Sequence, residues 1–521
     1  MQRGSPVAFL RLAVCVTAVA AAVLSCSRSD QAAPVWTLVP PWVGQGPPPA
    51  NLPTAPATTN PLLNLLPAPR LPGELFLTPT PDLFRTPPPL RTEAVTYVVR
   101  PGDSLNAIAV RFSVGANLIL SANTIPNPDS LWVGQVLLIP PPIPQAPGPS
   151  FKIVPDSELV DGPAAAFFDL PSFVAQGDSY LTRYTEEVEG RSLSGPGIVQ
   201  LVGQRYSVNP RLLLAVLEHQ SGWVTRRNVP TERLTYPMGF VGIGFEGLFS
   251  QLSWAADQLN AGYYRWRSGW AGPYILLDGS VILPGQGINA GTAGVQHLFA
   301  QLYRADAWRQ VVGEGGFYAI YQSLFGIPFD LAVEPLVPPG LTQPPMQLPF
   351  EPGTTWSFTS GPHGAWFSGS AWAALDFAPP GDAVGCVLSD EWVVASADGL
   401  VLRADQGEVI LDLDGDGLEQ TGWVLFYMHI ESRDRVVPGT FLHAGDRIGH
   451  PSCEGGFSNG THVHIARKYN GEWIPADAGV PFDLEGWISA GLGQEYDGTL
   501  SRGGVVLEAC ACRFPDNQIA R

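Results

Sequence analysis

Six of the eight histidines in this 521-residue chain lie after residue 360, and several stand in runs that could bind a metal. The run SNGTHVHI places His462 and His464 two residues apart. In a strand both side chains would project from one face, because successive side chains alternate between faces. Upstream lie His363 in a GPHG turn, Asp376 in an ALDF run and His429 in a YMHI run. Catalytic zinc takes three protein ligands and leaves a position for water, so this set predicts a zinc site.

Residues 350–490 must position these side chains. They alternate short β-type runs with glycine-rich turns, as in WVLFYMHI and THVHIARKY, which predicts an antiparallel β domain. The runs GPHGAWFSGSAWAALDF, LFYMHI and SCEGGFSNGTHVHIARKYNGEW resemble the β-lytic branch of the lysostaphin-type metallopeptidases, which includes staphylolysin. The thirteen-residue step from His363 to Asp376 favours this branch. In the other branch a histidine lies four residues before the aspartate, where this chain has Trp372.

This resemblance implies a role for each candidate residue. His363, Asp376 and His464 would bind zinc, while His429 and His462 would act beside the metal. Bound zinc lowers the pKa of water toward about 7 and polarises the scissile carbonyl. His462 is the expected general base, and His429 would stabilise the tetrahedral intermediate and help move the proton to the leaving amine. Some tyrosine contacts of the branch have no evident counterpart in this sequence.

Four of the six cysteines follow residue 380, and in an exported protein they favour disulfides over metal ligation. Cys453 could pair with Cys386, which would pin the loop before the HVH run. Cys510 and Cys512 are too close in sequence to be assigned to each other, so their connectivity stays open.

Two further groups of possible ligands lie in the same region. His443 and His450 match no position of the site and are expected at the surface. The run DLDGDGLEQ places Asp412, Asp414 and Asp416 in one turn, which suggests a Ca²⁺ loop. The run lacks the glutamate that an EF-hand requires at its twelfth position, so a solvated acidic hairpin is the competing prediction.

Residues 95–141 begin and end with β-type runs around two short helical stretches, which predicts a small βααβ unit. They resemble the LysM domain, which binds the N-acetylglucosamine chains of peptidoglycan or chitin. The resemblance implies a shallow groove between two loops. Its candidate residues are Gly102, Asp103, Ser104, Ile125, Asn127 and Asp129.

Residues 160–335 carry apolar residues at three- and four-residue steps, which predicts an α-helical domain. The run YSVNPRLLLAVLEHQSGW resembles the catalytic helix of the lysozyme-like lytic transglycosylases. Such enzymes need a carboxylic acid to protonate the glycosidic oxygen, and the matching position here is Gln220. Glu218 and Glu246 could substitute, but Glu218 lies roughly 200° around the helix from that position. The domain is therefore expected to hold glycan or to act as a spacer.

The N-terminal part predicts export. Residues 1–26 carry Arg3 and Arg11 and an apolar run that is short for a membrane span and fits a secretory signal. The ending VLSC resembles the bacterial lipobox, in which Cys26 would be lipidated; ordinary secretion and an uncleaved anchor are the alternatives. Residues 27–94 are rich in proline and predict a disordered tether.

The whole chain is too long for one core. We expect a multidomain protein with a small βααβ LysM module, an α-helical lysozyme-like domain and an antiparallel β-sheet peptidase domain. Linkers are expected at 142–159 and 336–349, and a C-terminal tail at 491–521. The formal net charge of −18 argues against nucleic-acid binding.

The expected function is that of a cell-envelope lipoprotein. It would bind peptidoglycan glycan, lie at the membrane through its lipid anchor, and cut peptide stems or cross-bridges with Zn²⁺. Two alternatives stay open. One is a non-catalytic wall-binding protein, and the other is a glycan-cleaving enzyme that acts through the helical domain.

Overall fold

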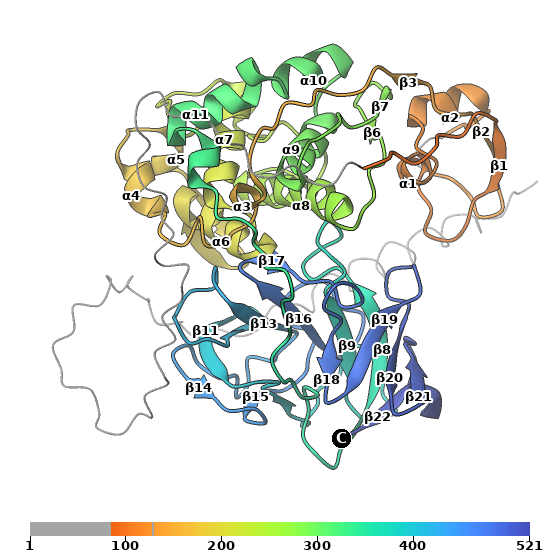
Figure 1. Ribbon diagram of the computed structural model, residues 1–521, viewed down its shortest axis with the longest axis vertical. Helices are drawn as coiled ribbons and strands as arrows, with labels where there is room; N and C mark the ends of the chain where they lie inside the picture. Colours follow the sequence, from red (N-terminus) through yellow and green to blue (C-terminus); the bar gives the residue numbers. More distant parts are fainter. Residues whose placement is uncertain (1–84, 128–129) are drawn as a thin grey trace, which may run out of the picture. The chain divides into compact units, whose positions relative to one another are not determined.

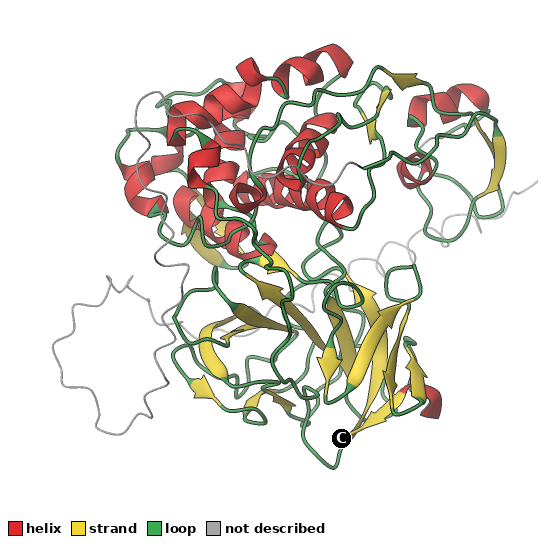
Figure 2. Cartoon of the chain, viewed as in Figure 1, coloured by secondary structure: helices red, strands yellow, loops and turns green. Residues whose placement is uncertain are grey.

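The computed structural model describes residues 85–127 and 130–521, and all of these belong to one compact unit (Figure 1). The predictions for the signal peptide, for Cys26, for most of the proline-rich tether and for Asp129 lie outside the described residues. Helices dominate the middle of the described chain and strands its last third (Figures 1 and 2). This order follows the change of hydrophobic period that the sequence shows.

The LysM region has the predicted βααβ order, and its two strands pair antiparallel. Ser104 caps the first helix, because its side chain accepts a hydrogen bond from the backbone N–H of Ala107. Within the described residues no single helix has the length and hydropathy of a membrane span; these two short helices reach them only together, across a bend of 106°. The elements are β1 (Val95–Val98), α1 (Leu105–Arg111), α2 (Ala116–Ala122) and β2 (Val136–Ile139).

The helical region contains α3 to α11 and two short hairpins. Its main helices have clear sequence signals: α7 begins after Asn209, whose side chain accepts from the N–H of Arg211, and ends at Gly222 with a φ of 72°. The helices are α3 (Asp156–Leu159), α4 (Leu170–Ala175), α5 (Tyr180–Arg183), α6 (Gly195–Tyr206), α7 (Pro210–Ser221), α8 (Leu248–Arg267), α9 (Ala290–Ala300), α10 (Ala305–Val311) and α11 (Ala319–Phe325). The hairpins are β4 (Thr185–Val188) with β5 (Arg191–Ser194), and β6 (Tyr274–Ile275) with β7 (Val281–Ile282).

The last region is built on a nine-stranded sheet with the order β14-β11-β12-β13-β16-β9-β8-β22, to which β17 is added beside β16. All pairs in this sheet are antiparallel, as predicted. Its strands are β8 (Thr355–His363), β9 (Ala374–Ala378), β11 (Gly399–Asp405), β12 (Glu408–Asp412), β13 (Trp423–Met428), β14 (Phe441–Leu442), β16 (Val463–Tyr469), β17 (Glu472–Trp473) and β22 (Gln518–Ala520). Smaller sheets contain β10 (Val393–Val394), β15 (Arg447–Gly449), β18 (Asp483–Leu484), β19 (Trp487–Gly491), β20 (Gly498–Arg502) and β21 (Val505–Glu508).

Three of the expected boundaries differ from the structure. The segment after residue 490 is not a tail, because β20 and β21 extend one sheet and β22 pairs with β8. The linker expected at 142–159 contains α3 and β3 (Pro144–Gln145), which pairs with β7. The linker expected at 336–349 buries Met346 and Leu348 in the core of the β region.

The large sheet is buried on both faces. Leu375 and Ile465 point into a core formed by the β region itself. Ala374, Phe426 and Ala466 point to the opposite face and belong to the core of the helical region. The helices and the sheet therefore share one apolar core, which explains why the central strands read as continuous apolar runs rather than alternating ones.

Candidate metal centre

Neighbouring strands of the large sheet bring the predicted site residues together. β16 pairs with β9 so that His464 lies opposite Asp376, and β13 places Met428, just before His429, opposite His464. His363 ends β8, the next strand beyond β9. One ligand atom from each of His363, Asp376 and His464 lies within 4.8 Å of the others.

Backbone carbonyls fix the two imidazole rings. His363 Nδ1 is 2.9 Å from the carbonyl oxygen of Gly361, and His464 Nε2 is 3.0 Å from that of Ala365. A carbonyl can only accept, so each of these nitrogens carries the proton of the neutral ring. The lone pairs then lie on His363 Nε2 and His464 Nδ1, which are 3.0 Å apart. Asp376 Oδ1 is 3.2 and 3.1 Å from these two atoms.

With both rings neutral, three electron-pair donors thus converge with no proton among them. Asp376 Oδ1 is buried and receives no hydrogen bond from the part of the chain that the structure describes. Lone pairs at this spacing repel one another unless a cation lies between them. Two imidazole nitrogens and one carboxylate oxygen, with the second ring nitrogens held by carbonyls, form a donor set that suits zinc. The residues present therefore fit a zinc ion.

The pKa shifts show that the Asp376 carboxylate draws positive charge to this donor set. Burial disfavours charge on Asp376, but His363 and His462 outweigh it and hold the pKa of Asp376 well below its usual range. Burial also opposes charge on His363, yet the carboxylate of Asp376 raises the pKa of that ring. Burial lowers the pKa of His464, and burial together with His462 lowers the pKa of His429 to about 3. At neutral pH the aspartate is ionised, while His429 and His464 are neutral.

His462 and His429 lie beside the three ligands, with their ring centroids 4.4 Å apart. His462 Nδ1 is 2.7 Å from the carbonyl oxygen of Gly460, and His462 Nε2 is 3.7 Å from Asp376 Oδ2. His429 Nδ1 is 2.8 Å from the carbonyl oxygen of Glu454. In its neutral form each ring therefore donates through Nδ1 and keeps an unprotonated Nε2. Both can accept a proton, and His429 can donate through Nε2 only after it has accepted one.

The sequence did not reveal two contributors to this site. Tyr496 stacks on His363, with ring centroids 4.8 Å apart and an angle of 21° between the planes. Glu495 accepts a hydrogen bond from the backbone N–H of Gly364, and the N–H of Tyr496 donates to the carbonyl of Pro362. Both residues lie between β19 and β20, in the segment expected as a tail. No periodic run or spacing marked them.

The four cysteines within the described residues form two disulfides. Cys386 and Cys453 are bonded, which confirms the pairing suggested by the sequence. The two loops that they join also meet where the N–H of Thr461 donates to the carbonyl of Gly385, directly before His462. The structure also bonds Cys510 to Cys512, the pair that the sequence left open.

The two histidines of the β region that lie outside the site differ. His443 is exposed, as expected. His450 is only 3% exposed, so its surface prediction was wrong. Its Nδ1 bonds the carbonyl of Glu391, and its ring centroid lies 3.9 Å from that of Trp392. His450 is therefore a buried histidine with its own hydrogen bond and packing contact.

The acidic turn after β12 gathers three carboxylates. Oxygens of Asp412, Asp414 and Asp416 lie within 4.8 Å of one another. However, the carboxylate of Asp412 accepts hydrogen bonds from the backbone N–H groups of Gly415 and Gly417 in its own turn. The turn is thus stabilised by the chain itself, and calcium binding stays a prediction.

The groove candidates of the LysM region have structural roles as well. Gly102 has a φ of 84°, which favours glycine, and Asp103 accepts hydrogen bonds from the Tyr97 hydroxyl and from the N–H of Arg100. Ser104 caps α1. These contacts shape the loop before α1. The other described candidates lie in the loop after α2: Ile125 and Asn127.

Gln220 lies at the end of α7 and is 8% exposed. Its carbonyl oxygen accepts from the Tyr303 hydroxyl at 3.2 Å. The carboxylate of Glu218 accepts from the backbone N–H and the hydroxyl of Thr225, so it closes the turn after the helix. Glu246 accepts from the Tyr236 hydroxyl. Both possible substitute acids are thus engaged in local hydrogen bonds.

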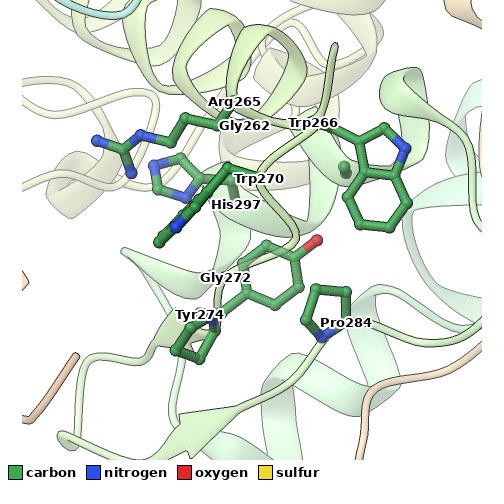
Figure 3. Close-up of a pocket in the computed structure, with 10 residues that line it drawn as sticks. Gly262, Arg265, Trp266, Trp270, Gly272, Tyr274, Pro284 and His297 are labelled. Atoms are coloured by element: carbon green, nitrogen blue, oxygen red, sulfur yellow. The ribbon is translucent and has the colours of Figure 1, made fainter. Parts of the chain in front are cut away.

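A hollow of about 260 Å³, part of it open to solvent, lies in the helical region (Figure 3). Arg265, Trp270 and Tyr274 line it together with His297, whose pKa burial lowers to about 3. Its lining comes from α8, α9 and the segment between them. The metal-centre residues do not take part in it.

Two family models match the chain. The model described as LysM domain matches residues 97–140, which confirms that prediction. The model described as LasA, N-terminal domain, matches residues 152–336. It covers the helical region. The lysozyme-like resemblance of this region is not shown and stays a prediction.

The chain is similar to curated proteins named Protease LasA. That of Pseudomonas aeruginosa strain UCBPP-PA14 is 26% identical over 347 residues, which is 63% of this chain and 76% of the relative. The Cortical fragment-lytic enzyme of Bacillus subtilis strain 168 is 54% identical over 44 residues, which is 8% of this chain and 10% of that protein. A solved structure described as the M23 metalloprotease pseudoalterin is 24% identical, with a TM-score of 0.27, over 32% of this chain and 94% of that one. The similarity to LasA and the LysM domain support a peptidoglycan-associated metallopeptidase.

Proposed function

We propose that this protein is an exported zinc endopeptidase of the cell envelope that binds peptidoglycan glycan through its LysM domain and hydrolyses the peptide stems or cross-bridges. The observation that carries the proposal is the convergence of His363, Asp376 and His464 with their lone pairs facing one another at 3.0–3.2 Å. The similarity to proteins named Protease LasA supports it. Lipidation at Cys26 would hold the enzyme at the membrane, facing the wall.

The five site residues divide the work of peptide hydrolysis. His363, Asp376 and His464 would hold zinc, which when bound acidifies a water molecule and polarises the scissile carbonyl. His462 accepts the proton of the attacking water at Nε2, because Gly460 holds the other nitrogen as a donor. His429 accepts a proton at Nε2 in the same way and then donates it to the developing oxyanion or the leaving amine.

The helical region is proposed to be non-catalytic. An amide at Gln220 cannot donate and recover a proton, and Glu218 is engaged by Thr225. Glycan cleavage would need an acid at this position. The region would instead support the peptidase and hold wall polymer.

The test uses residues 27–521, loaded with zinc and incubated with purified peptidoglycan, with the released fragments identified by mass spectrometry. We expect peptide cleavage that is lost in His464→Ala and kept in Gln220→Ala. Bound zinc and wall binding without cleavage would support the non-catalytic alternative. New reducing ends or anhydro-sugars that survive a zinc chelator would support glycan cleavage instead.

A further inference from the structure

A short loop at residues 364–371 lies between β8 and β9 and directly follows His363. Its Ala365 carbonyl accepts the hydrogen bond from His464 Nε2, at 3.0 Å. That bond keeps the proton of the neutral ring on Nε2 and turns the lone pair of Nδ1 toward His363 and Asp376. The position of the Ala365 carbonyl therefore decides which nitrogen of His464 faces the metal site.

Hydrogen bonds within the loop join its residues to one another. The N–H of Ala365 donates to the carbonyl of Ala371 at 3.0 Å, so the two ends of the loop are joined. The N–H of Trp366 donates to the hydroxyl of Ser370, which in turn donates to the carbonyl of Phe367. A displacement at one side of this loop is therefore transmitted to Ala365.

The helical region contacts the other side of the loop. Asp257 on α8 accepts a hydrogen bond from the N–H of Gly369 at 2.7 Å. The Tyr206 ring of α6 lies 6.1 Å from the Trp366 ring in an edge-to-face contact. The Arg205 guanidinium lies 5.3 Å from the same indole. Two helices thus hold a loop of the peptidase region.

The contact at Gly369 is too close for a side chain. A Cβ at this position would lie 2.0 Å from the backbone carbonyl oxygen of Asp257 and 2.7 Å from its Oδ1. Asp257 is 7% exposed and lies in the middle of α8, where the helix backbone cannot give way easily. Glycine is therefore required for the loop to seat on the helix.

We propose that the helical region is a positioning element of the metal centre: Asp257 seats the loop at residues 364–371 on α8, and the loop fixes the ring of His464 through Ala365. The inference rests on the proposed function, since it gives His464 the role of a zinc ligand. Asp257 is a positioning residue, because it acts through the loop and touches neither substrate nor metal.

The test compares four variants of the zinc-loaded chain with the unmodified protein. Gly369→Ala forces the loop off the helix, and Asp257→Ala removes the acceptor without adding an atom. Asp257→Asn keeps an oxygen acceptor for the N–H of Gly369. Gly162→Ala is the matched control, because its Cβ would lie 2.5 Å from the carbonyl oxygen of Asn470, where the helical region meets the sheet away from this loop.

Three quantities are measured: zinc affinity by competition with a chromophoric chelator, the visible absorption of bound Co²⁺, and kcat and KM on a soluble peptide. We expect Gly369→Ala and Asp257→Ala to weaken zinc binding by about 10-fold, the low end of what loss of a direct outer contact of a ligand costs, because both act on His464 only through the loop. They should shift the Co²⁺ bands and lower kcat with little change in KM. Asp257→Asn should stay close to the unmodified protein, and Gly162→Ala should lower the melting temperature alone.

Unchanged zinc affinity and Co²⁺ bands in Asp257→Ala would overturn the inference, as would an equal loss of affinity in Gly162→Ala. If Gly369→Ala does not fold, Asp257→Ala and its asparagine counterpart decide the question. Zinc affinity is measured without substrate, so the two claims separate. A protein that cleaves no peptide but loses zinc affinity in Asp257→Ala would keep this inference and reject the proposed function.

Discussion

In each histidine of the metal centre, one ring nitrogen meets a backbone carbonyl. This contact decides which nitrogen is left to bind metal or to accept a proton. His363 and His464 use opposite nitrogens to meet a carbonyl, so a different ring atom of each faces Asp376. His429 and His462 both donate through Nδ1 and keep Nε2 as a base. Ligand and base therefore differ in position and not in residue type. Removal of one base should leave the ligand set intact.

His462→Ala tests this separation. The variant keeps His363, Asp376 and His464, so we expect zinc content close to that of the unmodified protein. It loses the group that accepts the proton of water, so kcat should fall by about 10²- to 10⁴-fold, the usual contribution of general base catalysis. Metal analysis and peptide kinetics measure both. His443→Ala, which changes an exposed histidine, is the control, and loss of zinc from His462→Ala would contradict the division of roles.

The sequence predicted the histidines and the aspartate of this site from the spacing of His462 and His464 within one strand and from the resemblance of three local runs to a known family. It could not predict Tyr496, which reaches His363 from a turn with no periodic pattern. It also missed Asp257, which lies more than one hundred residues before the loop that it holds. Contacts between segments that are distant in the chain leave no signal in either segment alone.

Buried charges mark where the helices meet the sheet. Arg205 of α6 bonds Glu408 of β12 at 2.7 Å, and Lys468 of β16 bonds Glu419 at 2.6 Å. Arg403 joins the two carboxylates. Buried ions are tolerated when each has a partner, and loss of one partner leaves the other uncompensated. This network requires the helices and the strands to keep one relative position.

Asp161, just after α3, lies in the same region, and nearby positive charges compensate its buried carboxylate only in part. Burial outweighs the attraction of Lys468 and raises its pKa from 3.8 to about 6, with Glu419 adding to the rise and Gln420 and Arg403 opposing it. The folded state therefore binds this proton more tightly than the unfolded state does. The contribution of Asp161 to stability is largest below about pH 4 and is lost as the pH rises through about 6.

Asp161→Asn removes the free-energy cost of ionising this buried carboxyl group. We expect the free energy of unfolding to exceed that of the unmodified protein by about 3 kcal/mol at about pH 8, and by almost nothing at about pH 3.5, since a shift of about two pKa units corresponds to that energy. Urea denaturation at both pH values measures it. Asp382→Asn, an exposed change, should show no such difference. An equal gain at both pH values would show that packing and not charge is responsible.

Periodic patterns predicted the long elements, including α7, α8 and the central strands of the sheet. They did not predict β20, β21 and β22, because these strands have three to five residues and partners elsewhere in the chain. β22 pairs with β8, which begins at Thr355. Short strands at sheet edges are specified by their partners rather than by their own sequence.

The three regions of the molecule differ in whether they share a core. The helical region and the sheet share a core, so they form one unit. The LysM region has a core of its own, which contains Ile108 and Ile119. Side chains of the LysM core contribute nothing to the shared core. Wall binding and catalysis should therefore separate when the LysM region is removed.

Deletion of residues 95–141 tests that separation. Turnover of a soluble peptide should be unchanged, because the metal centre and its supporting helices remain. Cleavage of insoluble peptidoglycan should fall by about 100-fold, since the enzyme loses the high effective concentration that a tethered binding module provides. Sedimentation with cell-wall particles measures binding, and His464→Ala, which should sediment without cutting, is the control. Equal losses on the soluble peptide and on the wall would instead make the LysM region part of the catalytic unit.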